Sequence, residues 1–312
     1  MKPLTRERFE AARRYMEESA RPLERELFRV RFDGVAIDGT LSELGRYQNP
    51  DRGFGLGLEP DMRSPGSSSL HTGIALSHLR DLGVGPDHPL VLDAIAYLAD
   101  TLEPETHVWR PTSADVNDHP HGPWWNDHGE DLEELFDRFV VIPRARIASL
   151  LYRFVDAAPS RAWLDELAEE TVASIEELPN DKLWSGTLAY ALELADESAV
   201  PEALRRRLAD RILPDLRSLV TLDEETWPTY CTPPVLVAPR PDSVGAELIR
   251  ADIERNLDWL IDRQTERGCW EPNWLWGKAY PEAWEEAKRE WCGVVTYETL
   301  SALRAYGRLE SI

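Results

Sequence analysis

Apolar residues recur at helical spacing along most of the chain. Between residues 69 and 82 an apolar face is formed by Leu70, Ile74, Leu76, Leu79 and Leu82. This period predicts amphipathic helices, and no segment alternates as a half-buried strand does. The predicted helices span residues 5–32 with a break at Pro22, 40–47, 69–82, 89–102, 130–139, 143–155, 161–178, 182–194, 201–219, 244–264, 281–288 and 292–306. The pattern predicts an all-α fold of about five or six helix hairpins.

Four long loops separate these helices. They cover residues 50–68, 103–129, 222–242 and 268–280. Loops of such length in a compact domain usually carry function. Binding and catalytic residues are therefore expected in these loops first.

A motif near the C-terminus joins a predicted helix end to a tight turn. Trp259 and two aliphatic residues precede Gln264, which is followed by Gly268 and Trp270. The Gln side chain can bond carbonyls left unpaired at a helix end. Gly268 can supply the positive φ that stops a helix, and Trp270 can fold back as an apolar plug. We expect Trp270 to be buried and Gln264 to bond backbone at a neighbouring helix end.

A second copy of this motif lies near the N-terminus. Residues 44–55 contain Gln48, Gly53 and Phe54 in the corresponding places. Both copies lead, through a loop, into a helix that begins Thr-x3-Leu-x2-Leu, with the threonines at Thr72 and Thr296. The spacing predicts a repeated helix–loop–helix unit.

The two copies resemble the QW repeats of terpenoid cyclases and the related repeats of protein prenyltransferase β subunits. The resemblance implies an α/α toroid, in which helix hairpins form an inner and an outer ring, as a single domain over residues 1–312. It is specific at both ends of the chain and weak between residues 100 and 240. It implies architecture more than reaction, because one fold hosts many functions.

The catalytic motifs of those families are not preserved. Asn117 stands where the DxDD motif of class II terpene cyclases has its proton-donating Asp. An aspartate-rich Mg²⁺ motif is absent, and Cys231 follows Thr229 and Tyr230 instead of a zinc-binding Asp-x-Cys pairing. No resident metal or cofactor is predicted, and the reaction is left open.

The net charge of −22 disfavours nucleic acid and anionic membrane as partners. No 18-residue apolar stretch predicts a transmembrane segment, and the N-terminus lacks a signal peptide. The three cysteines, Cys231, Cys269 and Cys292, fit a reducing cytoplasm. Only four of the 35 basic residues are Lys, which suits either a halophilic protein or a high-GC genome. The oligomeric state is not predicted.

The acidic composition predicts a response to salt if it reflects halophily. Screening relieves repulsion among the excess carboxylates, so the melting temperature is expected to rise from low salt to molar KCl. Thermal unfolding over a KCl series measures this. A flat or falling melting temperature would leave genome composition as the explanation.

The densest polar cluster lies in the loop 115–128. It contains Asp115, Asp118, His119, His121 and Asp127. Imidazole beside carboxylate is typical of an acid/base centre, so these five residues are the predicted catalytic groups. A metal site using the histidines and a carboxylate, or a loop whose side chains only satisfy backbone, are the alternatives.

Aromatic residues supply candidate contacts to a substrate. The expected binding residues of this kind are Trp124, Trp125, Tyr230, Trp274 and Trp276. Their faces could stabilise a carbocation or stack on sugar rings, or they could fill the core. We expect the loop 115–128 to turn inward, with a carboxylate and a histidine facing Trp274 and Trp276.

The loop after the first motif adds three polar candidates for substrate binding. These are Glu59, Asp61 and His71. The simpler interpretation is that the acidic residues pair locally with Arg63 and that Ser69 caps the following helix.

Three functions fit these features. The leading one is an enzyme that acts on an apolar, possibly isoprenoid, small molecule in a central aromatic-lined cavity. The second is a carbohydrate-active enzyme, in which Glu59 or Asp61 faces Asp118 or Asp127 across an open cleft. The third is a non-catalytic binding toroid that holds a partner through exposed tryptophans.

Overall fold

The computed structural model describes residues 2–128 and 142–310. Within these ranges the regular structure is helical, and strand-like pairing is limited to isolated bridges. The all-α class is therefore confirmed. The helix predicted at residues 130–139 lies outside the described residues. In the described ranges, no helix combines the length and apolar composition needed to cross a membrane.

The chain divides into two compact units. The first contains Met1–Leu44 and Asp215–Ile312, and the second contains Gly45–Pro214. Gln48 and Phe54 of the first motif belong to the second unit, whereas Gln264 and Trp270 belong to the first. A single domain over residues 1–312, with its hairpins closed into a toroid, stays a prediction.

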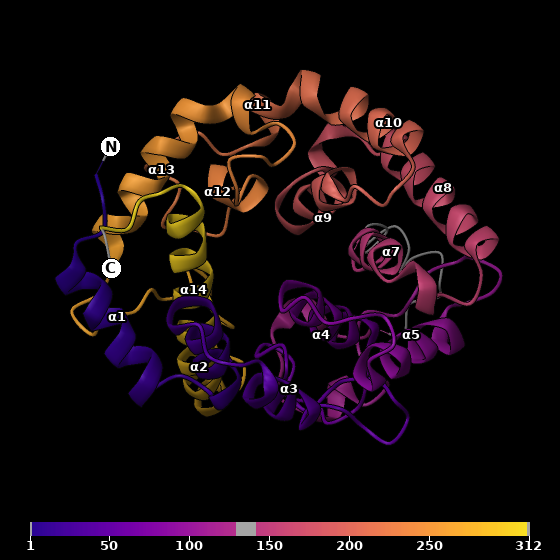
Figure 1. Ribbon diagram of the computed structural model, residues 1–312, viewed down its shortest axis with the longest axis horizontal. Coiled ribbons are helices and arrows are strands. Elements are labelled where there is room, and N and C mark those ends of the chain that lie inside the picture. Colours follow the sequence, from indigo (N-terminus) through magenta and orange to yellow (C-terminus); the bar gives the residue numbers. More distant parts are fainter. Residues whose placement is uncertain (1, 129–141, 311–312) are drawn as a thin grey trace. The chain divides into compact units, whose positions relative to one another are not determined.

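The second unit is built from helices that pair with their neighbours in sequence. These are α4 (Ser69–Asp81), α5 (Pro89–Thr101), α7 (Arg144–Arg153), α8 (Arg161–Glu177), α9 (Ser185–Asp196) and α10 (Glu202–Ile212). Helix α4 packs on α5, α7 on α8, and α9 on α10 (Figure 1). Helix α7 also contacts α4 and α9, which links the pairs into one unit. The loop between α5 and α7 holds two short 3-10 turns, Val116–Asp118 and Pro123–Trp125.

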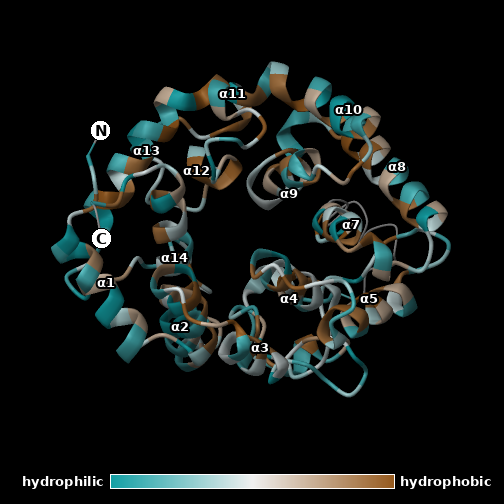
Figure 2. Cartoon of the chain, in the orientation of Figure 1, coloured by the Kyte–Doolittle hydropathy of each residue, from teal (hydrophilic) through white to brown (hydrophobic). Residues whose placement is uncertain are grey.

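Local signals explain where these helices begin. Ser68 caps α4, because its side chain accepts a hydrogen bond from the backbone N–H of His71, the third residue of the helix. The cap is therefore one residue earlier than Ser69, where it was expected. Pro89 occupies the first position of α5, where its missing N–H costs nothing. Hydrophobic and hydrophilic residues are interspersed along α8 and α10, as the sequence period requires (Figure 2).

The first unit combines both ends of the chain. Its helices are α1 (Arg6–Glu18), α2 (Pro22–Phe28), α3 (Asp38–Gly45), α11 (Leu216–Leu219), α12 (Pro234–Val237), α13 (Arg250–Arg263) and α14 (Pro281–Ala305). A π-helical turn, Arg29–Asp33, follows α2. Helix α14 packs on α1 and α2, and α12 packs on α13.

Two predictions in the first unit were wrong. The segments 281–288 and 292–306 form the single helix α14 and not two helices. The connecting residues are Arg289, Glu290 and Trp291, which include no helix breaker. Helix α12 forms inside the predicted loop 222–242 because Pro234 starts a turn whose Val237 is buried.

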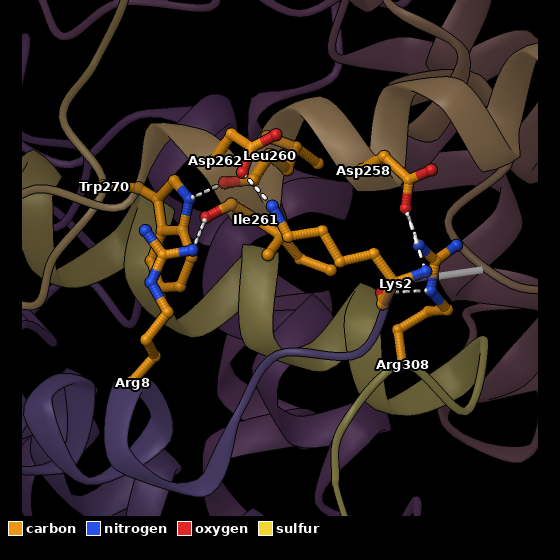
Figure 3. A network of polar contacts seen from close by, with 8 residues as sticks. All are labelled: Lys2, Arg8, Asp258, Leu260, Ile261, Asp262, Trp270 and Arg308. Carbon is orange, nitrogen blue, oxygen red and sulfur yellow. Dashed lines mark hydrogen bonds and ion pairs between the residues drawn. The ribbon is translucent and has the colours of Figure 1, made fainter.

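The C-terminal motif has the predicted roles. Gln264 ends α13, and its side-chain amide donates to the carbonyls of Arg8 in α1 (2.9 Å) and Gly268 (2.8 Å). Gly268 has φ +89°, and Trp270 is 3% exposed. The indole of Trp270 donates to the carbonyl of Leu260 in the last turn of α13 (2.6 Å; Figure 3). The tryptophan therefore both plugs the core and satisfies a carbonyl at the helix end.

The N-terminal motif repeats this turn with one change. Gln48 donates to the carbonyl of Arg52 at 3.4 Å, as Gln264 does to Gly268. Arg52 has φ +76°, so this residue and not Gly53 stands at the place of Gly268. A Cβ at Gly53 would lie 2.6 Å from the Tyr97 ring, so this glycine is needed for close packing instead.

The two copies also hold their following helices in the same way. The backbone N–H of Phe54 donates to Thr72 Oγ1 at 3.1 Å. The backbone N–H of Trp270 donates to Thr296 Oγ1 at 3.0 Å. These equivalent bonds support the predicted repeat. The helix start predicted at Thr296 is wrong, because Thr72 lies in the first turn of α4 whereas Thr296 lies in the interior of α14.

Trp109 belongs to a third turn of this kind, which spacing alone did not indicate. Its indole donates to the carbonyl of Leu98 in the last turn of α5 (2.8 Å), and it is 3% exposed. His107, two residues earlier, has φ +51°. No Gln and no Gly occupy this copy, so its sequence signature is lost while its geometry remains.

A buried arginine fastens the C-terminal end of the first unit to α13. Arg308 is 2% exposed and donates to the carbonyl of Lys2 (2.8 Å) and to Glu254 (2.5 Å). It also pairs with Asp258 (Figure 3). Because a guanidinium carries several donors in one plane, it can join three acceptors at once.

Gly268→Ala is expected to destabilise the first unit more than an ordinary glycine substitution at positive φ. A Cβ there would lie 2.3 Å from the carbonyl oxygen of Ala11, which is backbone and cannot rotate away. We expect a loss of about 2–4 kcal/mol, measured by urea unfolding. Gly34→Ala is the control, because Gly34 has φ +69° and open space around it. Equal losses at both positions would contradict the clash at Ala11.

Candidate functional site

Two loops of the second unit join at the N-terminal end of α4. Met62 and His121 form an isolated antiparallel bridge. The N–H of Arg63 donates to the carbonyl of Pro120 (3.0 Å), and the N–H of Gly122 donates to the carbonyl of Asp61 (2.8 Å). We call residues 59–71 and 113–127 together the loop junction. These bonds pair the backbones of two separate loops. The loop junction contains ten of the predicted catalytic and binding residues, which are Glu59, Asp61, His71, Asp115, Asp118, His119, His121, Trp124, Trp125 and Asp127.

An apolar cluster packs beneath the backbone of the loop junction and includes residues of both of its loops. It contains Met62, Leu70, Val116 and Trp125, with Ile74 and Ile142 packed against it. Trp125 is 9% exposed and therefore contributes mainly to this support, whereas Trp124 is 36% exposed. Of the two adjacent tryptophans, Trp124 has more surface available for a ligand.

Ionisable side chains are buried at the junction. Glu59 is 8% exposed, Asp61 2%, His71 0% and His121 3%. Moving such groups out of water is costly unless they are hydrogen-bonded, so proteins seldom place several together. A concentration of buried acids and imidazoles beside a surface loop is typical of a site that uses them.

His121 is held at both ring nitrogens. Nδ1 lies 2.7 Å from the carbonyl oxygen of His119, and Nε2 lies 2.6 Å from Asn126 Oδ1. Because a carbonyl only accepts, Nδ1 carries a proton. With Asn126 Oδ1 at Nε2 the ring carries two protons, and with the amide turned over Nε2 accepts and the ring is neutral. Asn126 can therefore hydrogen-bond to Nε2 whether or not that nitrogen carries a proton. It was not among the predicted residues, although it lies in the same loop.

Asp115 and His119 form an acid–imidazole pair. Asp115 Oδ2 is 3.5 Å from His119 Nε2, and both side chains are about one-third exposed (36% and 37%). Asp115 Oδ1 is buried against Gly66, where a Cβ would approach it to 2.6 Å. Among the described residues no hydrogen bond reaches this oxygen. One oxygen of the carboxyl thus faces the histidine and the other is buried without a donor, an arrangement that costs free energy.

Asn117 has a structural role in the loop. Its amide donates to the carbonyl of Asp127 (2.6 Å) and its Oδ1 accepts from the N–H of Asp127 (3.0 Å). This two-way bond closes the loop, which an Asp in place of Asn117 could not do because it lacks the donor. Asp127 Oδ2 is also 4.0 Å from Arg110, and Asp118 is exposed.

His71 takes part in capping α4. Its backbone N–H donates to Ser68 Oγ (3.1 Å), and its Nδ1 lies 3.0 Å from the same hydroxyl. Ser69, the expected cap, donates instead to the carbonyl of Arg110 (2.7 Å) and so ties α4 to the second loop. His71 is therefore positioned by the helix start.

The predicted aromatic residues of the first unit fall into two environments. Tyr230 is 57% exposed and meets Trp274 edge-on at 6.2 Å between ring centroids, and Trp274 meets Trp291 at 4.9 Å. Trp276 is 2% exposed and packs against Trp284. Tyr230 and Trp274 thus offer surface to a ligand, whereas Trp276 fills the core.

A site that joins the loop 115–128 to Trp274 and Trp276 would span the two units, and it stays a prediction. In the described ranges, no group of three or more His, Cys, Asp or Glu side chains is arranged to hold a metal ion. The binding roles of Glu59, Asp61 and His71 also stay predictions. Comparison with protein-family models, with curated proteins and with solved structures gives no match to this chain.

Proposed function

We propose that this chain is an enzyme that transfers protons on a small, largely apolar molecule, with isoprenoid compounds as the first substrate class to test. The observation that carries the proposal is the loop junction with its buried His121. This imidazole lies between a carbonyl that only accepts and an amide that can donate or accept, so Nε2 can take up or release a proton. That is the requirement for a general acid or base.

The other junction residues have supporting roles in this proposal. Asp115 and His119 form a pair that could relay a proton between Asp115 Oδ2 and His119 Nε2. Trp124, in the same loop, supplies exposed apolar surface. Asp61 positions His121 through the backbone bond to Gly122.

The isoprenoid class rests on the repeated Gln–aromatic motif. The equivalent bonds of Phe54 to Thr72 and of Trp270 to Thr296 support a repeat like the QW repeat. The sequential pairing of helices in the second unit supports an α/α toroid as the wider architecture. The free cysteines suit a cytoplasmic location, and the acidic charge argues against nucleic acid as a partner.

A carbohydrate-active enzyme is the second candidate. The backbone pairing of Asp61 with Gly122 favours it, because Glu59 and Asp61 then approach the loop that carries Asp118 and Asp127. Two carboxyl groups about 5–10 Å apart across an open cleft would complete such a site.

A ligand panel distinguishes these candidates. The full chain is incubated with isoprenoid diphosphates, with squalene-type hydrocarbons and with oligosaccharides, and both the melting temperature and the products are measured. Turnover of an isoprenoid supports the first candidate, and cleavage of a glycosidic bond supports the second. A chain that neither binds nor converts any of the three classes would overturn both.

A further inference from the structure

Two buried cysteines meet inside the C-terminal motif. Cys269 lies in the loop of this motif, residues 264–271, which we call the motif loop. Its side chain is 0% exposed, and that of Cys292 in α14 is 1% exposed. The N–H of Trp270 donates to Thr296 Oγ1 (3.0 Å), which fastens the loop to α14. Cys292 is one helical turn before Thr296 and therefore on the same face of α14. The two thiol groups are hydrogen-bonded to one another, and both are free of disulfides.

The surroundings make the two sulfurs unequal. Thr265 Oγ1 lies 3.3 Å from Cys269 Sγ. The hydrogen bond from Cys292, with help from Thr265 and the charge of Arg267, lowers the pKa of the Cys269 thiol to about 6. The same bond raises the pKa of Cys292, together with burial. These contacts favour the thiolate at Cys269 over the thiolate at Cys292.

Charged and titratable groups on three segments of the chain interact with this pair of cysteines. They are Tyr15 of α1, Arg267 and Glu271 of the motif loop, and Lys288 of α14, which is paired with Glu271 at 2.9 Å. The positive charge of Arg267 favours the thiolate, whereas Glu271 opposes it. A thiolate stabilised by donors next to a protonated thiol is the arrangement of reactive dithiols.

A cavity lies beside Tyr15 and Arg267, two of the groups that act on the pair. It has a volume of about 270 Å³ and is lined by residues of α1 and of the motif loop, including Arg14, Tyr15 and Arg267. Tyr15 lines this cavity and also interacts with Cys292 through its hydroxyl. The cavity admits a molecule as small as a peroxide, while the burial of both sulfurs excludes bulky disulfides.

We propose that Cys269 and Cys292 are a redox-active dithiol that small peroxides convert into a reversible disulfide. The Cys269 thiolate attacks one oxygen of hydrogen peroxide, the O–O bond breaks, and the departing hydroxide takes a proton to become water. Cys269 is then a sulfenic acid. Cys292 loses its proton and attacks that sulfur, the S–S bond forms, the S–O bond breaks, and a second water leaves. Two thiols are oxidised and one peroxide is reduced to two waters.

The disulfide would have a structural consequence. It would join the loop that holds Gln264 and Trp270 covalently to α14, where only hydrogen bonds and packing hold it now. The oxidised chain is expected to melt at a higher temperature than the reduced chain, because the crosslink restricts the unfolded state. This inference is independent of the proposed function at the loop junction.

Peptide mapping tests the dithiol directly. The full chain is treated with hydrogen peroxide, unfolded in an alkylating reagent and digested without reduction. We expect a linked peptide of Cys269 and Cys292 that dithiothreitol releases, with Cys231 alkylated. Cys231→Ser is the matched control and should give the same linked peptide, because burial raises the pKa of the Cys231 thiol. In Cys292→Ser, dimedone should label Cys269.

The pH dependence of the reaction adds a second readout. The rate of disulfide formation should rise as pH increases through about 6 and then level off, because Cys269 is then fully deprotonated. An ordinary thiol would continue to gain rate up to a pH near 8.5. Recovery of both cysteines in alkylated form after peroxide treatment, oxidation confined to Cys231, or a midpoint near that of an ordinary thiol would each overturn the proposal.

Discussion

Replacing Trp270 with alanine is expected to lower the free energy of unfolding by about 3–5 kcal/mol, as for other buried large aromatic side chains. The side chain is 3% exposed, so its removal leaves a cavity at the end of α13. It also removes the donor to the carbonyl of Leu260, at 2.6 Å. Equilibrium unfolding in urea measures this loss. It is calculated from the shift in the midpoint urea concentration, provided that the dependence of the unfolding free energy on urea is unchanged.

Two further variants separate the contributions of Trp270. Trp270→Phe keeps most of the apolar volume and loses the indole donor, so it should cost about 1–2 kcal/mol. Trp184→Ala removes a tryptophan that is 49% exposed and should change stability by less than about 1 kcal/mol. If Trp270→Ala were as mild as Trp184→Ala, the plug would not be part of the first unit's core.

The C-terminal motif could be predicted from sequence because its roles are local. A helix end needs a residue of positive φ and a partner for its last carbonyls, and Gly268 and Trp270 supply both within a few residues. The N-terminal copy was less clear for a physical reason. There Arg52 adopts the positive φ, while Gly53 is required by the Tyr97 ring, a contact across 44 positions in the chain that no local pattern contains.

Helix identity followed the hydrophobic period, and the errors arose where that signal is weak. Residues 289–291 carry no breaker, so α14 continues, although apolar periodicity fades there. At Trp109 the turn persists without the residues that mark it elsewhere. Such a turn needs one residue at positive φ and one large aromatic side chain, and several sequences satisfy both requirements.

At the candidate site, too, the sequence predicted features that lie within one loop and missed contacts between loops that are far apart in the chain. Residue types near Asp115 indicated acid/base chemistry, because carboxylates and imidazoles are concentrated there. The bridge between Met62 and His121 joins loops 59 positions apart, so sequence could not pair Asp61 with Gly122. Nor could it separate Trp274, which offers surface, from Trp276, which is buried, because both occupy one loop.

His121→Gln is expected to lower kcat/KM by about 10²–10⁴-fold on whichever substrate the panel identifies, the usual contribution of a general acid or base. Gln can still bond the carbonyl of His119 or the amide of Asn126, so the loop junction should keep its stability. His128→Gln is the matched control, because His128 is exposed in the same loop and should retain full activity. Steady-state kinetics with purified variants measure both.

Asn126→Asp distinguishes proton transfer by His121 from a positioning role. A carboxylate at Nε2 favours the doubly protonated ring, so the limb of the pH–rate profile that reports this group should move to higher pH. A residue that only shapes the loop would lower the rate without moving the limb. Retention of wild-type kcat/KM by His121→Gln, or a pH profile of Asn126→Asp that coincides with wild type, would exclude His121 as the acid or base. Asp115 and His119 would then be the pair to test, since their 3.5 Å contact sets a carboxylate beside an imidazole in the loop junction.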